Sequence, residues 1–409
     1  MTATLVPLLK TEAVSSKTLH ERYGSLLELV RSLIGVVPNC DAYLEIWPPG
    51  FRTYNVMVPN LLNLPLSVWG LATPPSIVGL ALYASSRAAG CGYCSAHTCS
   101  FALRRGAKAE RVARAMDDED AERTPAEHAV LAVARWLSRV PVEPEAGERA
   151  ALREHFREPD AEWIVLGVAM MGWLNKFMDA VGVELESEAI GDAAGVIGAS
   201  GWSPGKHANG AVVAGSSPPR DTLGTKLGIL PRIPSALSMD RRWTKGVPGK
   251  APAIGLYLKE ATGHDFPVIG RLSHARAARA MATMVRDNLD PATTRIGLEA
   301  KCLAGAVFCA VVGDDPLAQD VGALAECHGI ASDRMAAVVR FASGSGELPG
   351  VDSRTASILE LARAASPSPA VIDDGVVDRA RPLEPAAIVE TVVWLSVLQM
   401  LHRLTVFYA

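Results

Sequence analysis

Three cysteines and a histidine lie close together in residues 90–99, which read GCGYCSAHTC. Cys91 and Cys94 form a Cys-x-x-Cys pair, His97 follows three residues later, and Cys99 ends the segment. Such residues can form a redox dithiol, in which one thiolate attacks, a second thiol resolves and a histidine moves protons. The same residue types could instead bind a metal ion, or be buried core cysteines without chemistry.

The residues that follow predict a helix that positions the two sulfur atoms. Gly90 allows a tight turn before the cluster, and SAHTCSFALRRG indicates a helix that ends at Gly106. On this helix Cys91, Cys94 and His97 share one face, because residues three apart are neighbours. A helix N-terminus favours a thiolate, and a nearby imidazole lowers the pKa of a thiol. The spacing therefore favours a redox dithiol.

A metal site is the less favoured interpretation of the same cluster. Structural zinc sites usually draw ligand pairs from two separated segments, whereas these four candidate ligands lie in one short stretch. Cys99 falls on another side of the predicted helix, and we expect it to be a core residue. No second cysteine pair or cysteine–histidine pair at metal spacing occurs elsewhere in the chain. We therefore expect neither a bound metal nor a cofactor.

The composition indicates a globular protein rather than a disordered one. The chain has 409 residues, 49% of them hydrophobic and 21% charged, which favours two domains. The formal net charge of −4 gives no electrostatic reason to expect nucleic acid or an acidic membrane as partner. Residues 163–174 and 386–401 are apolar but too short or too polar for clean spans, so we expect buried core helices. Seven cysteines without a visible secretion signal indicate a reducing, cytoplasmic setting.

Turn-forming residues divide the chain into two halves. Residues 191–221 are rich in glycine, serine and proline and indicate a linker between domains at 1–190 and 222–409. Both halves show helical rather than strand periodicity, so an all-α fold is expected. The segment Thr124-Pro125-Ala126-Glu127 predicts a helix start with a capping box.

The two halves also show signs of an internal duplication. Residues 86–116 align without a gap to residues 309–339, and each window is followed by a break, a helix and a closing apolar helix. In this alignment Asp314, Leu317 and Asp320 stand opposite Cys91, Cys94 and His97. The second copy would therefore have lost the dithiol. Asp314 itself is expected to start a helix, because aspartate followed by proline favours that position.

Two segments resemble the alkyl hydroperoxidase D-like (AhpD-like), carboxymuconolactone decarboxylase superfamily. Residues 86–98, SRAAGCGYCSAHT, are similar to its core motif, and residues 175–184, NKFMDAVGVE, are similar to the closing helix of its peroxidase-related members. The likeness covers about residues 50–188. It implies tandem duplicated AhpD-like helical domains with a degenerate second copy. It also implies a homo-oligomer, because members of the family commonly form trimers or hexamers.

The resemblance implies roles for the three residues of the cluster. Cys94 would attack a peroxide, Cys91 would resolve the product as a disulfide, and His97 would act as base or proton relay. The helix dipole alone favours Cys91 as the more acidic thiol. Members with a full relay often carry a glutamate at the position of Gly79 and some carry a histidine at that of Tyr93, so both residues depart from the pattern.

The expected function is that of a thiol-dependent peroxidase or disulfide reductase. Its partners would be a hydroperoxide or disulfide substrate and a dithiol reductant. Two alternatives stay open, a redox-sensing or scaffold protein without turnover and a specialised enzyme of the same superfamily with other chemistry. The sequence does not name a residue that replaces the relay glutamate.

Overall fold

The computed structural model describes residues 3–71, 73–117, 122–208, 220–348 and 350–409. Within these ranges the chain forms helices, turns and irregular loops, and no strand occurs. The expected all-α fold class is therefore confirmed.

The helices in the described part of the first half are α1 (Val6–Leu9), α2 (Ser16–Ile34), α3 (Cys40–Leu44), α4 (Pro48–Leu61), α5 (Pro75–Ala88), α6 (Gly92–Arg104), α7 (Ala109–Ala113), α8 (Pro125–Trp136), α9 (Glu148–His155), α10 (Glu158–Val181), α11 (Ser187–Ile197), η1 (Gly198–Ser200) and η2 (Gly205–His207). Those of the second half are α12 (Leu223–Ile229), η3 (Leu230–Arg232), α13 (Ile233–Trp243), α14 (Ala251–Thr262), α15 (Pro267–Gly270), α16 (Ala275–Asn288), α17 (Leu298–Val312), α18 (Asp315–Cys327), α19 (Ser332–Ala342), α20 (Ser353–Ala365), α21 (Asp374–Ala380) and α22 (Pro385–Tyr408).

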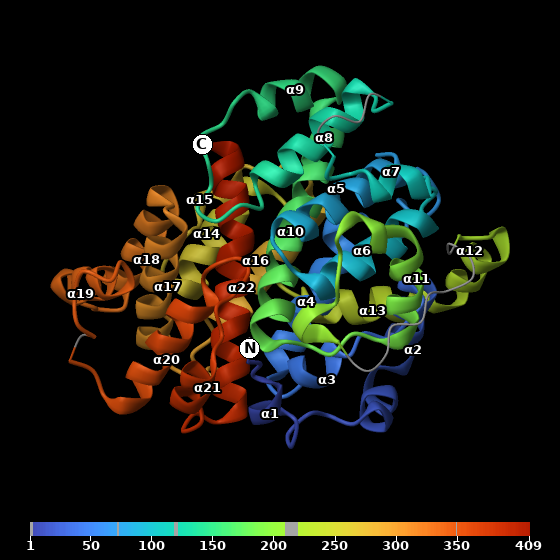
Figure 1. Ribbon diagram of the computed structural model, residues 1–409. Coiled ribbons are helices and arrows are strands. Elements are labelled where there is room, and N and C mark those ends of the chain that lie inside the picture. The colour runs from blue at the N-terminus through green and yellow to red at the C-terminus, as the bar shows by residue number, and fades with distance from the viewer. Residues whose placement is uncertain (1–2, 72, 118–121, 209–219, 349) are drawn as a thin grey trace.

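Two long helices form the centre of the molecule. Helices α10 and α22 have 24 residues each and lie side by side (Figure 1). Helices α5, α6 and α8 pack on α10, while α17, α18 and α20 pack on α22. Helix α4 packs on α16 beside the same seam. The buried apolar side chains of both halves form one continuous core, so neither half is closed without the other.

The two central helices are also the most apolar ones. By length and composition alone, both α10 and α22 could cross a membrane. In the structure 94% and 89% of their most apolar windows are buried inside the protein. They therefore serve here as the core helices expected for residues 163–174 and 386–401.

The helices of the two halves follow one another in a matching order. Helices α6 and α18 have 13 residues each, and each begins after a side chain that caps it. Cys91 accepts a hydrogen bond from the Cys94 amide, and Asp314 accepts one from the Leu317 amide. The helix start expected at Asp314 is confirmed.

The segment expected to be a linker is folded over much of its length. Helix α11 continues to Ile197, past the expected start of the linker at residue 191. Trp202 and His207 are buried, and the Trp202 indole donates to the Gly92 carbonyl oxygen at 3.0 Å. Residues 191–208 therefore belong to the first half, because two large side chains anchor a segment whose composition suggests a loop. Residues 209–219 lie outside the described part of the chain.

Two local predictions of helix starts can be compared with the structure. The capping box is confirmed, since the Thr124 hydroxyl accepts from the Glu127 amide and the Glu127 carboxylate accepts from the Thr124 amide. Helix α6 differs from its prediction, because it begins at Gly92 and Cys91 is its N-cap rather than a residue on its face. The Cys91 sulfur therefore lies at the positive end of the helix.

The seam between α10 and α22 requires a glycine at position 172. A Cβ atom there would lie 2.9 Å from Cδ and Nε of Arg403 and 3.1 Å from the Gln399 carbonyl oxygen. We expect Gly172→Ala to lower the free energy of unfolding by about 1–3 kcal/mol, as overpacking does elsewhere. Gly322→Ala on α18 is a matched control, because nothing lies within 4 Å of the added carbon. Denaturant unfolding of both variants tests the packing; equal effects would contradict it.

Candidate functional site

The Cys91 sulfur lies at the N-terminus of α6. Gly90 has φ +72°, a conformation that favours glycine and turns the chain from α5 into the new helix. The Cys91 side chain then accepts a hydrogen bond of 3.2 Å from the Cys94 amide. A helix N-terminus presents free amide groups and a positive dipole end. The local fold therefore stabilises a negative charge on this sulfur.

The histidine that contacts Cys91 is His207 from η2. Its Nδ1 lies 2.8 Å from the Val183 carbonyl oxygen, which can only accept, so Nδ1 carries the proton of this bond. Its Nε2 lies 3.6 Å from Asp179 Oδ1, and the ring lines the same pocket as Cys91. Asp179 lies on α10, so the site joins residues from three separate segments.

The charges at this site favour an ion pair between sulfur and imidazole. Burial raises the pKa of the Cys91 thiol, but hydrogen bonds from Cys94 and His207 and the His207 charge outweigh it and lower the value to about 6. Burial lowers the pKa of His207, but hydrogen bonds to Asp179 and Cys91 and their charges raise it to about 9. These opposite shifts in pKa favour a thiolate on Cys91 and an imidazolium on His207.

A lysine and a backbone amide hold Asp179 in place. Lys206 Nζ lies 3.0 Å from Oδ1, and the Ala370 amide donates to Oδ2 at 2.6 Å. Burial opposes ionisation of Asp179, but His207, Lys206 and the Ala370 amide together lower its pKa. Ala370 belongs to the second half, so that half takes part in building the site.

Gly92 allows the loop that carries His207 to lie close over α6. A Cβ atom at Gly92 would lie 2.9 Å from the carbonyl oxygens of both Ser203 and Pro204. The missing side chain lets the loop approach the N-terminus of α6. This close approach brings His207 to Cys91.

Cys94 faces a second histidine, His97, on the other side of the pair. His97 Nε2 lies 2.7 Å from Glu186 Oε2. The Tyr93 hydroxyl and the Asn39 amide donate to Glu186 Oε1 at 2.9 and 2.5 Å. Burial and the neighbouring Cys91 raise the pKa of Cys94 well above its usual range, so this residue is a thiol near neutral pH.

A carboxylate binds His97 although Gly79 stands where the resemblance places a glutamate. Gly79 packs against α6, and a Cβ atom there would lie 2.7 Å from the Ala102 Cα atom. A glutamate therefore has no room at this position. Glu186, which precedes α11, supplies the carboxylate instead.

The tyrosine between the two cysteines lies between the two histidines. The Tyr93 ring centroid is 4.5 Å from that of His97 and 5.9 Å from that of His207. Burial and Glu186 raise the pKa of Tyr93 well above its usual range, so its hydroxyl keeps its proton and donates to Glu186. The ring separates the Cys91 side of the site from the Cys94 side.

Two pockets of different polarity meet at the dithiol. Cys91 lines a polar pocket of about 390 Å³, together with Asp179, Lys206 and His207. Cys94 lines an apolar pocket of about 90 Å³ that also contains His97. Because Cys91 and Cys94 are only 0% and 3% exposed, reagents must reach the sulfur atoms through these pockets.

The structure brings together some, but not all, of the predicted site residues. Cys91 and Cys94 are adjacent as predicted, whereas His97 shares a pocket with Cys94 and His207 shares one with Cys91. Sequence reasoning missed His207 and Glu186. The only available signal was a histidine within a segment that composition indicated to be a loop.

The remaining interpretations of the cysteine cluster can also be compared with the structure. Cys99 is fully buried in the core, as expected for a small packing residue. Among the residues that the structure describes, no group of three or more histidine, cysteine, aspartate or glutamate side chains could hold a metal ion.

Glu186 is expected to stabilise the fold through its three donors. Burial opposes its ionisation, but the charge and hydrogen bond of His97 and the Asn39 amide lower its pKa. We expect Glu186→Gln to lower the free energy of unfolding by about 1.5–3 kcal/mol at neutral pH, the range for hydrogen bonds to charged groups. This difference is present above the ordinary glutamate pKa of about 4.3 and is lost as pH falls through the lower native value.

Denaturant unfolding at several pH values measures this contribution. Glu188→Gln is the matched control, because Glu188 lies two residues away and is exposed. The free energy of unfolding of Glu188→Gln should follow that of the unmodified protein at every pH. The free energy of unfolding of Glu186→Gln should equal that of the unmodified protein only at acidic pH. A constant gap down to low pH would contradict the assignment.

Comparisons with protein-family models, with curated proteins and with solved structures yield no match for this chain. The function therefore has to be argued from the site itself.

Proposed function

We propose that the protein is a dithiol oxidoreductase that reduces a hydroperoxide or a disulfide with Cys91 and Cys94. The observation that carries this proposal is the placement of Cys91 at the N-terminus of α6, in one pocket with His207 and Asp179. It lowers the pKa of one cysteine to about 6, and the pKa of its neighbour is raised. One thiolate beside one thiol is the arrangement that thiol-dependent reduction uses.

In this proposal Cys91 attacks and Cys94 resolves, the reverse of the roles implied by the family resemblance. The thiolate is the nucleophilic form of cysteine, and Cys91 is the more acidic residue. Cys91 also lines the larger polar pocket, in which a hydrophilic oxidant is soluble. His97, with Glu186, is placed to accept the proton of Cys94.

The steps with a hydroperoxide balance without a cofactor. The Cys91 thiolate attacks the terminal oxygen, the O–O bond breaks, and the leaving alkoxide takes a proton from the His207 imidazolium. Cys91 is then a sulfenic acid. The Cys94 sulfur attacks the Cys91 sulfur, the thiol proton and the hydroxyl leave as water, and a disulfide forms.

The reduced state is restored by a dithiol reductant. A thiolate of the reductant attacks one sulfur of the Cys91–Cys94 disulfide, and its second thiol completes the exchange. Two electrons and two protons pass from the reductant to the protein, which regenerates the Cys94 thiol and the Cys91–His207 ion pair. A disulfide substrate would be reduced by the same exchange in the opposite direction.

We also propose that the chain consists of tandem AhpD-like helical domains with a degenerate second copy. The matching order of α5–α10 and α17–α22 supports this, as does the shared capping pattern at Cys91 and Asp314. In the second copy Asp314 Oδ2 lies 2.6 Å from His402 Nδ1, so a carboxylate replaces the thiol. The second copy then serves as the partner surface that closes the core of the first.

Mass spectrometry with one equivalent of hydrogen peroxide tests the proposal. We expect a loss of two mass units that maps to a Cys91–Cys94 disulfide, and a Cys99→Ser variant should react in the same way. Turnover with a dithiol reductant distinguishes an enzyme from a redox sensor, which would be oxidised without sustained rate. The absence of any Cys91–Cys94 disulfide would overturn the proposal.

A further inference from the structure

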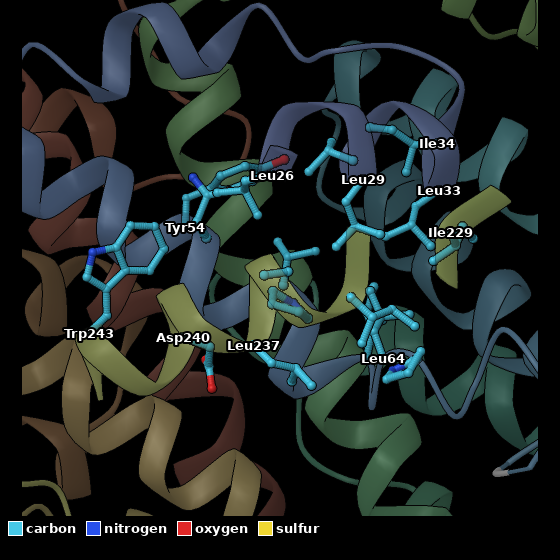
Figure 2. Close-up of a pocket in the computed structure, with 18 of the residues that line it drawn as sticks. Leu26, Leu29, Leu33, Ile34, Tyr54, Leu64, Ile229, Leu237, Asp240 and Trp243 are labelled. Atoms are coloured by element: carbon cyan, nitrogen blue, oxygen red, sulfur yellow. The ribbon is translucent and has the colours of Figure 1, made fainter. Parts of the chain in front are cut away.

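A second apolar cavity lies between the two halves of the chain (Figure 2). It measures about 100 Å³ and is enclosed by α2 and α4 of the first half and by α13 of the second. Representative side chains of its wall are Leu26, Leu33, Tyr54, Ile233, Leu237 and Trp243. The wall is almost entirely hydrocarbon and aromatic, so it offers little to a charged ligand.

This cavity adjoins the apolar pocket at Cys94. The two share five wall residues, which are Ile34, Tyr54, Val58, Leu62 and Phe101. A ligand that occupies the outer cavity therefore needs to pass only these shared side chains to reach Cys94 and His97. The polar pocket at Cys91 has none of these residues in its wall.

The polar side chains in the wall of the outer cavity, Asn55, Asp240 and Arg276, already have hydrogen-bond partners. Asp240 Oδ1 accepts from Asn60 Nδ2 at 2.7 Å, Arg276 Nε donates to Asn60 Oδ1 at 2.6 Å, and Asn55 Nδ2 donates to the Phe51 carbonyl oxygen at 3.0 Å. These bonded side chains therefore offer a ligand few free hydrogen-bond donors and acceptors. At the Cys94 end the wall contains His97, whose ring is bonded to Glu186 behind it.

The dimensions and polarity together indicate the class of ligand. An engineered apolar cavity of about 150 Å³ holds a benzene molecule, so each of these cavities suits a hydrocarbon group of about that size or slightly smaller. Apolar pockets with a few polar groups at one point fix the orientation of a ligand through that point. Here that point is His97 beside the Cys94 sulfur.

We propose that the two cavities form one binding site for a small molecule with a hydrocarbon body, whose single polar group lies at Cys94 and His97. Such a molecule binds on the opposite side of the dithiol from the polar pocket at Cys91. The purpose of the site would be to deliver an apolar reactant to the dithiol, and this purpose rests on the proposed function. The existence of the binding site does not depend on that function, because binding requires no turnover.

Helix α13 provides the variants that test this site. Ala236 lies in the cavity wall, so Ala236→Trp fills the outer cavity from a helix distant from both cysteines. Ser238 lies on the same helix, is exposed and does not line the cavity, so Ser238→Trp is the matched control. Leu237 lines the cavity and is 36% exposed, so Leu237→Arg places a charge at the wall with little demand on the core.

Calorimetric titration with octan-1-ol is the first measurement. We expect binding to the unmodified protein and to Ser238→Trp, with a negative heat-capacity change that marks apolar burial. Affinity should fall at least about tenfold in Ala236→Trp and in Leu237→Arg. Circular dichroism melting shows whether each variant is folded, and a folded Leu237→Arg protein keeps the test valid if Ala236→Trp does not fold.

Site-resolved alkylation by iodoacetamide, at an alkaline pH and over a time at which Cys94 of the unmodified protein is measurably modified, is the second measurement. Octan-1-ol should slow the modification of Cys94 at least about threefold and leave that of Cys91 unchanged. Absence of binding, equal affinity in the Ala236 and Ser238 variants, or protection of Cys91 rather than Cys94 would each overturn the site. Disulfide formation with hydrogen peroxide reports separately on the proposed function, so failure of one proposal is distinguishable from failure of the other.

Discussion

Replacement of Cys91 by serine is expected to reduce the rate of peroxide consumption by at least about a thousandfold, as loss of a covalent nucleophile does elsewhere. The physical reason is that Cys91 carries the thiolate, whereas the burial of Cys94 and its neighbour Cys91 keep Cys94 a thiol. Stopped-flow measurement of hydrogen peroxide loss under single-turnover conditions gives the rate.

Two other serine variants separate the roles of the cysteines. Cys94→Ser should still consume one equivalent of peroxide and accumulate a sulfenic acid on Cys91, because only the resolving step is lost. Cys99→Ser should behave like the unmodified protein. If Cys94→Ser is inactive while Cys91→Ser forms a stable sulfenic acid on Cys94, the roles are those of the family resemblance and our assignment is wrong.

Replacement of His207 by asparagine is expected to raise the pKa of Cys91 from about 6 to above the ordinary thiol value of about 8.5. The imidazolium charge and its hydrogen bond are lost, whereas burial, which raises this pKa, remains. Asparagine can still donate to the Val183 carbonyl oxygen, so the loop keeps its anchor. The measurement is the pH dependence of Cys91 alkylation, whose midpoint should move upward by more than two pH units.

The rate of Cys91 alkylation at neutral pH should fall less in His207→Asn than the shift of the midpoint alone would predict. At neutral pH the thiolate fraction falls, but a thiolate of higher pKa is intrinsically more nucleophilic, which offsets part of the loss. His97→Gln is the matched control, because His97 lies on the Cys94 side and should leave the Cys91 midpoint near 6. A midpoint that moves in His97→Gln and not in His207→Asn would show that the wrong histidine has been assigned.

The prediction of a cysteine pair beside a helix depends on residues that are close in sequence, and the structure contains both the close pair and the helix. Cys91 and Cys94 are close because they are close in sequence, and the helix after them follows from local helical preference. The capping box at Thr124 depends on residues three apart and is confirmed for the same reason. Only the first turn of the Cys91 helix was misplaced, because a cysteine is not among the residues expected to cap a helix.

Long-range features of the site could not be predicted from spacing. His207, Asp179 and Glu186 come from a loop, a central helix and the start of α11, and no spacing rule places them at the cysteines. The prediction of a linker also differs from the structure over residues 191–208. The many small residues of this segment gave no indication that Trp202 anchors it to Gly92. Such contacts depend on how helices approach one another rather than on sequence separation.

By itself the sequence determined that this protein is all-helical and carries a cysteine pair at the start of a helix, where the dipole favours Cys91 as the more acidic thiol. Only the tertiary structure decided that an imidazole lies beside this sulfur and further lowers its pKa, because the fold brings His207 there from η2. It also decided that the pair faces a polar pocket on one side and an apolar one on the other. Both outcomes follow from the packing of segments distant in sequence, which sets burial and charge at a site whose residue types were already visible.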